Sequence, residues 1–345
     1  MQPERRKITP ATHAPESNQK ISPARKRQTI TRTPAFRNVA AGMFRFCQRL
    51  GLSITPRHFY WPVPDLASLA AKNWSACILS GGVDLQLARQ KLFVEQVLSQ
   101  YAPEWDFPES ATDREEQFHF NNGFFERVDA EVAYSMVRHF RPKRIIEVGS
   151  GYTTKLFAQA LCRNQQEGQP GELVSIEPYP APVLKRGFPG LTKLITKRVQ
   201  ELPVDVFETL ESGDILFLDS SHVVALDSDV VHEFLRILPV LKSGVIVHLH
   251  DIFIPADYPR KFVMTNLCFW SEQYLLEAFL SYNRVFNVLW SSSAMQFHHR
   301  EVLERHFIEW NASYERMPSA VRTFSPTLDG KNVWPCSFWM QKTAV

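Results

Sequence analysis

A short apolar run at residues 145–148 is followed by the turn Gly149-Ser150-Gly151 and then by an apolar pattern with helical spacing. The run has the length of a buried strand, and Thr153 or Thr154 is a reasonable start for a helix over residues 155–161. Strand, glycine turn and helix in this order predict the opening of a nucleotide-binding βαβ unit. The glycines let the backbone approach a ligand closely, and the helix presents free N–H groups at its N-terminus.

Further apolar runs predict the other strands of a sheet, and amphipathic stretches between them predict helices. The strands are expected at residues 173–177, 194–195, 213–219, 245–251, 284–290 and 334–341. The last strand is expected to pair antiparallel with the sixth at the sheet edge. The helices are expected at residues 129–140, 203–210, 228–238, 270–282 and 302–310.

Some of these segments carry more specific expectations. Asp129 is a candidate N-cap for its helix. Residues 118–125 are aromatic and turn-rich, which fits either a lid over a ligand or a loop held by core aromatics. The helix over 228–238 is expected to bury Val231, Phe234, Leu235 and Leu238, and the helix over 270–282 to expose Glu272 and Glu277.

Acidic and imidazole side chains gather at the carboxyl ends of the predicted strands. Glu147, Glu177 and Asp219 end three of them, His222 follows the third after two serines, and His250-Asp251 ends a fourth. In a doubly wound sheet, ligands bind outside these ends. Several acids and imidazoles at one edge are costly unless a cationic group neutralises them. The pattern therefore favours a ligand or metal site at this edge.

An acid before a Gly-x-Gly turn, with Glu177 ending the next strand about 30 residues later, resembles class I S-adenosylmethionine-dependent methyltransferases. The resemblance implies an α/β, Rossmann-like fold with a seven-stranded, mostly parallel sheet and an antiparallel last strand. It also implies S-adenosylmethionine as cofactor, with the ribose hydroxyls held by Glu177. The residues implied in cofactor binding are Glu147, Gly149, Ser150, Gly151, Tyr152, Thr153, Glu177 and Asp219.

Asp219-x-x-His222 together with His250-Asp251 resembles the metal-dependent O-methyltransferase and cephalosporin-hydroxylase-like branch, of the methyltransferase domain 24 type. That branch implies a metal on Asp219 and Asp251 and a base at His222. His250 stands where the branch has a carboxylate, and it becomes a third candidate ligand. An imidazole suits Mn²⁺, Fe²⁺ or Zn²⁺ better than Mg²⁺. A divalent metal (Mg, Mn or Fe) is therefore an open second cofactor.

The function implied is methyl transfer to an oxygen of a small-molecule acceptor. Asp257, Tyr258 and Arg260 lie in a proline-rich loop after the fifth strand and are candidate acceptor-binding residues. Two alternatives stay open: a metal-dependent oxygenase-like enzyme on the same fold, and a non-catalytic cofactor-binding module. A dehydrogenase is disfavoured because the third glycine of the dinucleotide fingerprint is missing.

Charged residues are distributed unevenly along the 345-residue chain. The net charge is +3, but residues 1–40 hold nine Lys/Arg against two Asp/Glu. This proline-rich segment is expected to be a disordered basic tail, with at most a weak contact to nucleic acid or an anionic membrane. Residues 41–120 are expected to form a helical N-terminal extension, and residues 121–345 the methyltransferase domain.

The five cysteines are scattered and form no Cys-x-x-Cys pair, which fits a reducing, cytoplasmic location. The chain has no apolar stretch of the roughly 18 residues that a transmembrane helix needs. No specific nucleic-acid partner and no oligomeric state are predicted.

Overall fold

The computed structural model describes residues 34–54, 62–74, 76–79, 81–310, 327–328, 331–332 and 335–343. The chain divides into two units, residues 1–70 and 71–345. The described part of the first unit contains helix α2 (Pro34–Arg49) and the short helix α3 (Leu66–Leu69). Helix α2 begins inside the tail expected over residues 1–40, and residues 1–33 of that tail lie outside the described residues. No helix among the described residues is long and apolar enough to cross a bilayer.

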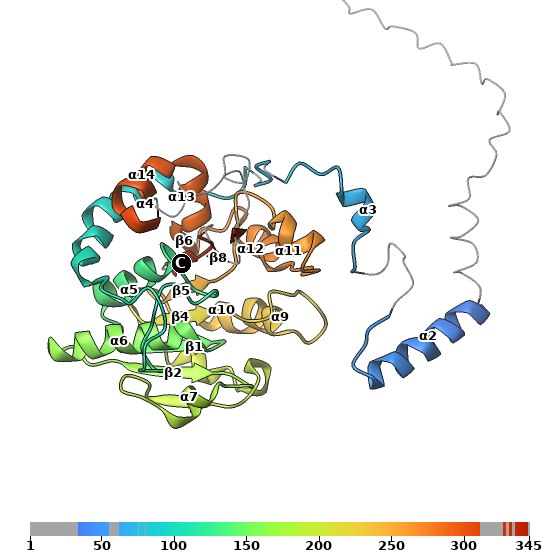
Figure 1. Cartoon of the computed structure of the whole chain (residues 1–345), viewed down its shortest axis with the longest axis horizontal. Helices are drawn as coiled ribbons and strands as arrows, with labels where there is room; N and C mark the ends of the chain where they lie inside the picture. The colour runs from blue at the N-terminus through green and yellow to red at the C-terminus, as the bar shows by residue number, and fades with distance from the viewer. Residues whose placement is uncertain are drawn as a thin grey trace, which may run out of the picture. The chain divides into compact units, whose positions relative to one another are not determined.

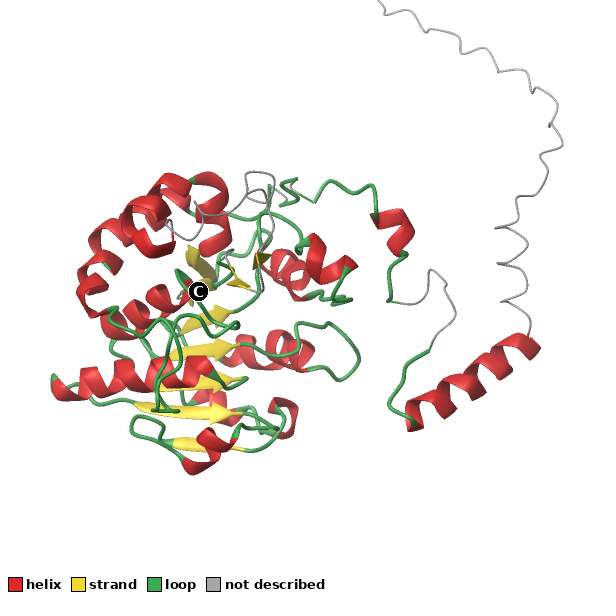
Figure 2. Ribbon diagram, in the orientation of Figure 1, coloured by secondary structure: helices red, strands yellow, loops and turns green. Residues whose placement is uncertain are grey.

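The second unit is built on a seven-stranded sheet with the order β3-β2-β1-β4-β5-β9-β6 (Figures 1 and 2). The first five strands are parallel, and β9 is antiparallel to both of its neighbours. The predicted Rossmann-like sheet is confirmed. The strands are β1 (Arg144–Val148), β2 (Glu172–Ile176), β3 (Lys193–Ile195), β4 (Ile215–Leu218), β5 (Ile246–Leu249), β6 (Phe286–Ser291) and β9 (Phe338–Lys342); β7 (Thr327–Leu328) and β8 (Lys331–Asn332) form a separate hairpin.

The predicted antiparallel pairing of the last strand with the sixth, at one edge of the sheet, is confirmed. Strand β9 lies between β5 and β6, so β6 is the edge strand. Phe338, Trp339 and Met340 are fully buried, and an interior position covers both faces and both hydrogen-bonding edges of this apolar strand. Trp334, which was expected to begin the strand, lies outside the described residues.

Helices cover both faces of the sheet, because alternate residues of its strands enter two different cores. Ile145 and Phe217 belong to the core beneath helices α5 and α6, whereas Ile146 and Leu216 belong to the other core. The helices and helical turns of this unit are α4 (Leu87–Gln96), η1 (Leu98–Glu104), α5 (Asp129–Phe140), α6 (Tyr152–Gln166), α7 (Pro182–Arg186), η2 (Val199–Glu201), α8 (Asp205–Glu208), α9 (Asp229–His232), η3 (Glu233–Ile237), α10 (Leu238–Val240), α11 (Arg260–Met264), α12 (Glu272–Leu280), α13 (Ser292–His298) and α14 (Arg300–His306).

Helix α4 packs on the β6 side of the sheet and against α13 and α14. Its buried Gln90 accepts a hydrogen bond from the backbone N–H of Ser291 at 2.8 Å.

The loop over residues 118–125 is held by core aromatics, because Phe118, Phe120 and Phe125 are buried. This part of the expected N-terminal extension therefore contributes to the core of the second unit.

Three expectations about helix faces were wrong. Helix α5 begins after Val128, and the side chain of Asp129 accepts hydrogen bonds from the chain leading into β9 instead of capping its own helix. Leu235 is exposed, because η3 is a π-helix whose wider turn shifts the buried face to Val230, Phe234 and Ile237. Glu272 is only 2% exposed, because the first turn of α12 packs against the polar edge of the sheet.

Candidate active site

The glycine turn after β1 is clamped between two neighbouring strands. The N–H of Gly149 donates to the carbonyl of Ile176 at 3.0 Å, and the N–H of Asp219 donates to the carbonyl of Val148 at 2.9 Å. Gly149 has φ +81°, and a Cβ atom there would lie 1.9 Å from the backbone oxygen of Asp219. Only glycine fits this position without moving β4 away from the turn.

Glu147 lies behind this turn with no exposed surface. Its carboxylate accepts hydrogen bonds from the hydroxyls of Thr153 at 2.6 Å, Thr154 at 2.7 Å and Ser175 at 2.6 Å. Burial raises the pKa of Glu147 to about 7, against the lowering effect of the three hydroxyls. The side chain therefore ties the first turn of α6 to β1 and β2 and does not line the surface.

A cleft of about 270 Å³ opens beside the turn, at the carboxyl ends of β1, β2 and β4. Glu177 lines it and accepts hydrogen bonds from the N–H groups of Tyr179 at 2.7 Å and Ser150 at 3.3 Å. A carboxylate has about four acceptor positions, so Glu177 retains capacity for two more donors. The cleft is lined by Val148, Gly149, Ile176, Glu177, Pro178, Tyr179, Arg198, Val199, Gln200, Asp219, Ser220 and Asp229.

Four of the predicted residues meet at the ends of β4 and β5. The Nε2 atom of His222 lies 3.4 Å from carboxylate oxygens of both Asp219 and Asp251. The Nδ1 atom of His250 lies 3.5 Å from the same oxygen of Asp219 and 3.8 Å from Asp251. His222 and Asp251 both have positive φ, at +59° and +54°. Strained backbone of this kind occurs where the surrounding structure fixes functional side chains.

Glu272 joins this cluster, although its spacing along the helix had predicted an exposed position. Its carboxylate lies 2.9 Å from Nδ1 of His222. The N–H groups of Ser271 and Glu272 also donate to the backbone carbonyl of His222, at 2.9 and 3.1 Å. No local pattern relates these two distant segments, so only the fold could reveal the contact.

The charges in the cluster depend on one another. Burial works against protonation of His222, but Asp219, Glu272 and Asp251 together raise its pKa well above the usual range. The pKa of Asp219 is lowered, since His250 and His222 outweigh its burial. Burial also lowers the pKa of His250, but Asp219 and Asp251 overcome this effect and raise it to about 9.

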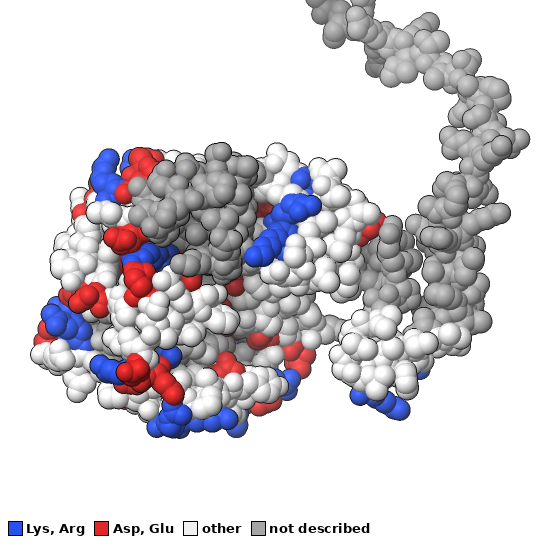
Figure 3. Space-filling view, viewed as in Figure 1, with Lys and Arg blue, Asp and Glu red and all other residues white. Residues whose placement is uncertain are grey.

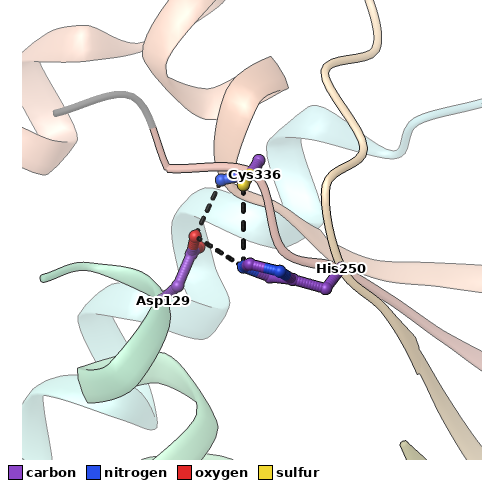
Figure 4. Close-up of side chains that lie close together, drawn as sticks. All are labelled: Asp129, His250 and Cys336. Carbon is purple, nitrogen blue, oxygen red and sulfur yellow. Dashed lines mark hydrogen bonds and ion pairs between the residues drawn. The ribbon is translucent and has the colours of Figure 1, made fainter. Parts of the chain in front are cut away.

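A second group of side chains lies behind His250 (Figure 4). Asp129 from α5, His250 after β5 and Cys336 before β9 point toward one another and are all buried. The Nε2 atom of His250 lies 3.6 Å from Sγ of Cys336 and 3.9 Å from an oxygen of Asp129. Asp129 also accepts hydrogen bonds from the N–H groups of Cys336 and Ser337 and from the hydroxyl of Ser292. This carboxylate is thus occupied in joining α5, α13 and β9.

Comparison with known proteins matches residues 146–252, from β1 to just beyond β5, to the family described as a methyltransferase domain. The chain therefore contains a methyltransferase domain of the class I, S-adenosylmethionine-dependent type. An uncharacterized protein of Archaeoglobus fulgidus is 31% identical over 176 residues, which span 49% of this chain and 78% of that protein. Among solved structures, the plantazolicin methyltransferase BamL, in complex with a triazolic desmethylPZN analog and SAH, covers 76% of this chain and 100% of its own, at 10% identity and a TM-score of 0.33.

The cleft of this methyltransferase fits its cofactor in chemical character. Glu177 offers free acceptor positions for hydroxyl groups, and the backbone turn at Gly149 approaches the cleft without a side chain. A Cβ atom on Gly151 would meet nothing within 4 Å, so the open side of the turn is free for a ligand. Within the described residues, the buried hydroxyl of Ser150 has no hydrogen-bond partner.

The donor atoms beside the cleft also fit a divalent metal. Asp219, His222 and Asp251 offer ligand atoms within 4.8 Å of one another. Tetrahedral coordination with metal–donor distances of about 2.0–2.2 Å separates neighbouring donors by roughly 3.3–3.6 Å. The 3.5 Å separation between His250 and Asp219 falls in this range, and the 3.8 Å separation between His250 and Asp251 lies just above it. Mixed carboxylate and imidazole donors favour Mn²⁺, Fe²⁺ or Zn²⁺ over Mg²⁺.

The three candidate acceptor-binding residues differ in exposure: Asp257 and Tyr258 are buried, whereas Arg260 is exposed. Asp257 is buried and contacts Lys72 and the hydroxyl of Tyr274. Tyr258 is also buried, and its hydroxyl accepts a hydrogen bond from the N–H of Gln273 at 3.0 Å. Arg260 is exposed at the start of α11. Asp257 and Tyr258 are therefore engaged in holding the loop after β5 against α12.

Proposed function

We propose that this methyltransferase transfers the methyl group of S-adenosylmethionine to an oxygen atom of a small-molecule acceptor, with His222 as the base. One observation carries the proposal. Asp219 lines the cleft and at the same time lies 3.4 Å from Nε2 of His222. A proton acceptor is thus adjacent to the place where the cofactor binds, which is the arrangement that alkylation of a hydroxyl group requires.

Cofactor binding is assigned to the turn and to the ends of β2 and β4. Glu177 binds the ribose hydroxyls, and Asp219 borders the same cleft. The methionine portion lies against Gly149, Ser150 and Gly151 and the first residues of α6, Tyr152 and Thr153, with Glu147 fixing Thr153 from behind. The sulfonium of the cofactor supplies an activated methyl group, so the protein mainly aligns the acceptor and removes its proton.

Asp219, Asp251 and His250 are assigned as ligands of a divalent metal. Such an ion would lower the pKa of an acceptor oxygen by Lewis-acid polarisation. The carboxylates that raise the pKa of His222 are partly those that would hold the ion. Neutralising them favours the unprotonated imidazole, which can then accept a proton near neutral pH. Metal loading and base function are therefore coupled in this proposal.

One observation favours a second function. Imidazole and carboxylate donors on one metal are typical of iron oxygenases, and His222, His250, Asp219 and Asp251 supply both types here. Iron content together with acceptor-dependent oxygen consumption would identify that chemistry, whereas methyl transfer consumes no oxygen.

The test begins with calorimetric titration of the full chain with S-adenosylmethionine and S-adenosylhomocysteine, after bound metals are measured by mass spectrometry. Methyl transfer from labelled cofactor is then followed on a panel of hydroxylated small molecules, with added Mn²⁺, Mg²⁺ or Fe²⁺ and with a chelator. We expect metal-stimulated transfer that His222→Ala abolishes while cofactor binding is retained. Cofactor binding without transfer to any hydroxyl acceptor, or transfer unaffected by His222→Ala, would overturn the proposal.

A further inference from the structure

Helix α2 exposes a continuous apolar face. Val39, Met43, Phe46 and Leu50 are 69%, 55%, 59% and 62% exposed. Their spacing of four, three and four residues places them on one side of an α-helix. Exposed apolar residues scattered singly are ordinary, but an aligned row of this kind marks a surface that is covered when the protein functions.

The polar and basic side chains of α2 lie away from this row. Gln48 lies opposite the apolar row, and the exposed Asn38, Arg45 and Arg49 lie between the two, on one side of the helix. In the view of Figure 3, the described part of α2 shows Lys or Arg side chains (blue) and no Asp or Glu side chains (red). The sequence extends this bias, because residues 17–64 contain nine Lys/Arg and no Asp or Glu: Lys20, Arg25, Lys26, Arg27, Arg32, Arg37, Arg45, Arg49 and Arg57.

The apolar and basic sides of α2 together identify the kind of surface to which this helix can bind. Nine cations spread over 48 residues without one acid match an extended anionic surface rather than a single acidic pocket. A nucleic acid would attract these cations but would leave the row of Val39, Met43, Phe46 and Leu50 in water. An anionic lipid bilayer satisfies both faces, because its headgroups attract the cations and its acyl boundary takes up the apolar row.

We propose that α2 is an in-plane membrane-binding helix that lays its apolar face into an anionic lipid surface. The helix is shorter than a membrane span and is not expected to cross the bilayer. Leu52 and Ile54, which follow the helix and are also exposed, extend the apolar contact. The proposal is independent of the chemistry assigned to the active site, and it would concentrate the methyltransferase at anionic membranes.

The experiment measures co-sedimentation of the full chain with vesicles. Phosphatidylcholine vesicles containing phosphatidylglycerol are compared with vesicles of phosphatidylcholine alone, at low and at raised salt. Phe46→Glu and Gln48→Glu form a matched pair, because they add the same charge to opposite faces of α2. We expect salt-sensitive binding to the anionic vesicles that falls at least about tenfold in Phe46→Glu and less than about threefold in Gln48→Glu.

Circular dichroism and urea denaturation of both variants check that they remain folded. No sedimentation of the wild-type chain with anionic vesicles would overturn the proposal. An equal loss in the two variants would also overturn it, because the apolar face would then play no part. Binding to an RNA oligonucleotide that survives Phe46→Glu, without vesicle binding, would assign the basic segment to nucleic acid instead.

Discussion

The Nδ1 atom of His222 lies 2.9 Å from a carboxylate oxygen of Glu272, and both side chains are buried. This contact fixes the plane of the imidazole and directs Nε2 toward Asp219 and Asp251. Carboxylates that hold the second nitrogen of a functional histidine commonly set its orientation and basicity. Glu272 is therefore a positioning residue for the proposed base.

Replacing Glu272 tests this relationship. Glu272→Gln keeps the shape of the side chain but removes a charge that raises the pKa of His222. We expect kcat to fall about 10–100-fold with unchanged cofactor affinity. The acidic limb of the kcat–pH profile should move to lower pH, because a less basic His222 loses its proton at lower pH. Steady-state kinetics across pH measure both effects, and Glu277→Gln on the same helix is the control. A uniform loss of activity with no movement of that limb would indicate a merely structural contact.

Cofactor affinity is expected to depend on Glu177. The Glu177→Ala variant removes the acceptors assigned to the ribose hydroxyls, and hydrogen bonds to a charged group contribute about 1.5–3 kcal/mol each. We expect the Kd for S-adenosylmethionine, measured by calorimetry, to rise at least about tenfold. Glu172→Ala is the matched control, since Glu172 begins the same strand but pairs with Arg144 away from the cleft. Equal affinities of the two variants would contradict the assignment.

The two glycines of the turn should respond differently to alanine. At Gly149, φ of +81° and a Cβ position 1.9 Å from the oxygen of Asp219 force the turn away from β4. We expect Gly149→Ala to lower the free energy of unfolding by roughly 1–3 kcal/mol or more, as measured by urea denaturation. In Gly151→Ala the new methyl group meets nothing within 4 Å, so stability should be nearly unchanged. Comparable losses at both positions would show that the clamp does not hold the turn.

The buried Glu147 makes stability depend on pH. Burial raises its pKa from 4.5 to about 7, so the folded protein binds a proton that the unfolded chain has already released between these values. The stabilisation from this bound proton is fully present below pH 4.5 and is lost as the pH rises through 7, by an amount on the order of 3 kcal/mol. Glu147→Gln cannot titrate, so its free energy of unfolding should rise relative to wild type across this window. Urea denaturation at several pH values measures the difference, and Glu172→Gln should show none. A constant offset between wild type and Glu147→Gln would rule out this titration.

The sequence predicted those features that depend on neighbouring residues. Strand β1, the glycine turn and α6 follow from local apolar patterns and from the conformational freedom of glycine. Parallel strands present their carboxyl ends at one edge, so placing Asp219, His222, His250 and Asp251 after two such strands was enough to bring them together. The family resemblance added the cofactor to this geometry.

Only the tertiary structure decided which distant segments complete the site. Glu272 reaches His222 from 50 positions away, and Asp129 reaches Cys336 from 207 positions away, through contacts that no local period encodes. The insertion of β9 between β5 and β6 likewise depends on which edges remain open once the parallel strands have paired. Side-chain periodicity reports which face of an element is apolar, but the partner of a buried polar group is set by packing of the whole chain, because its burial is tolerated only where another segment supplies the opposite charge or hydrogen bond.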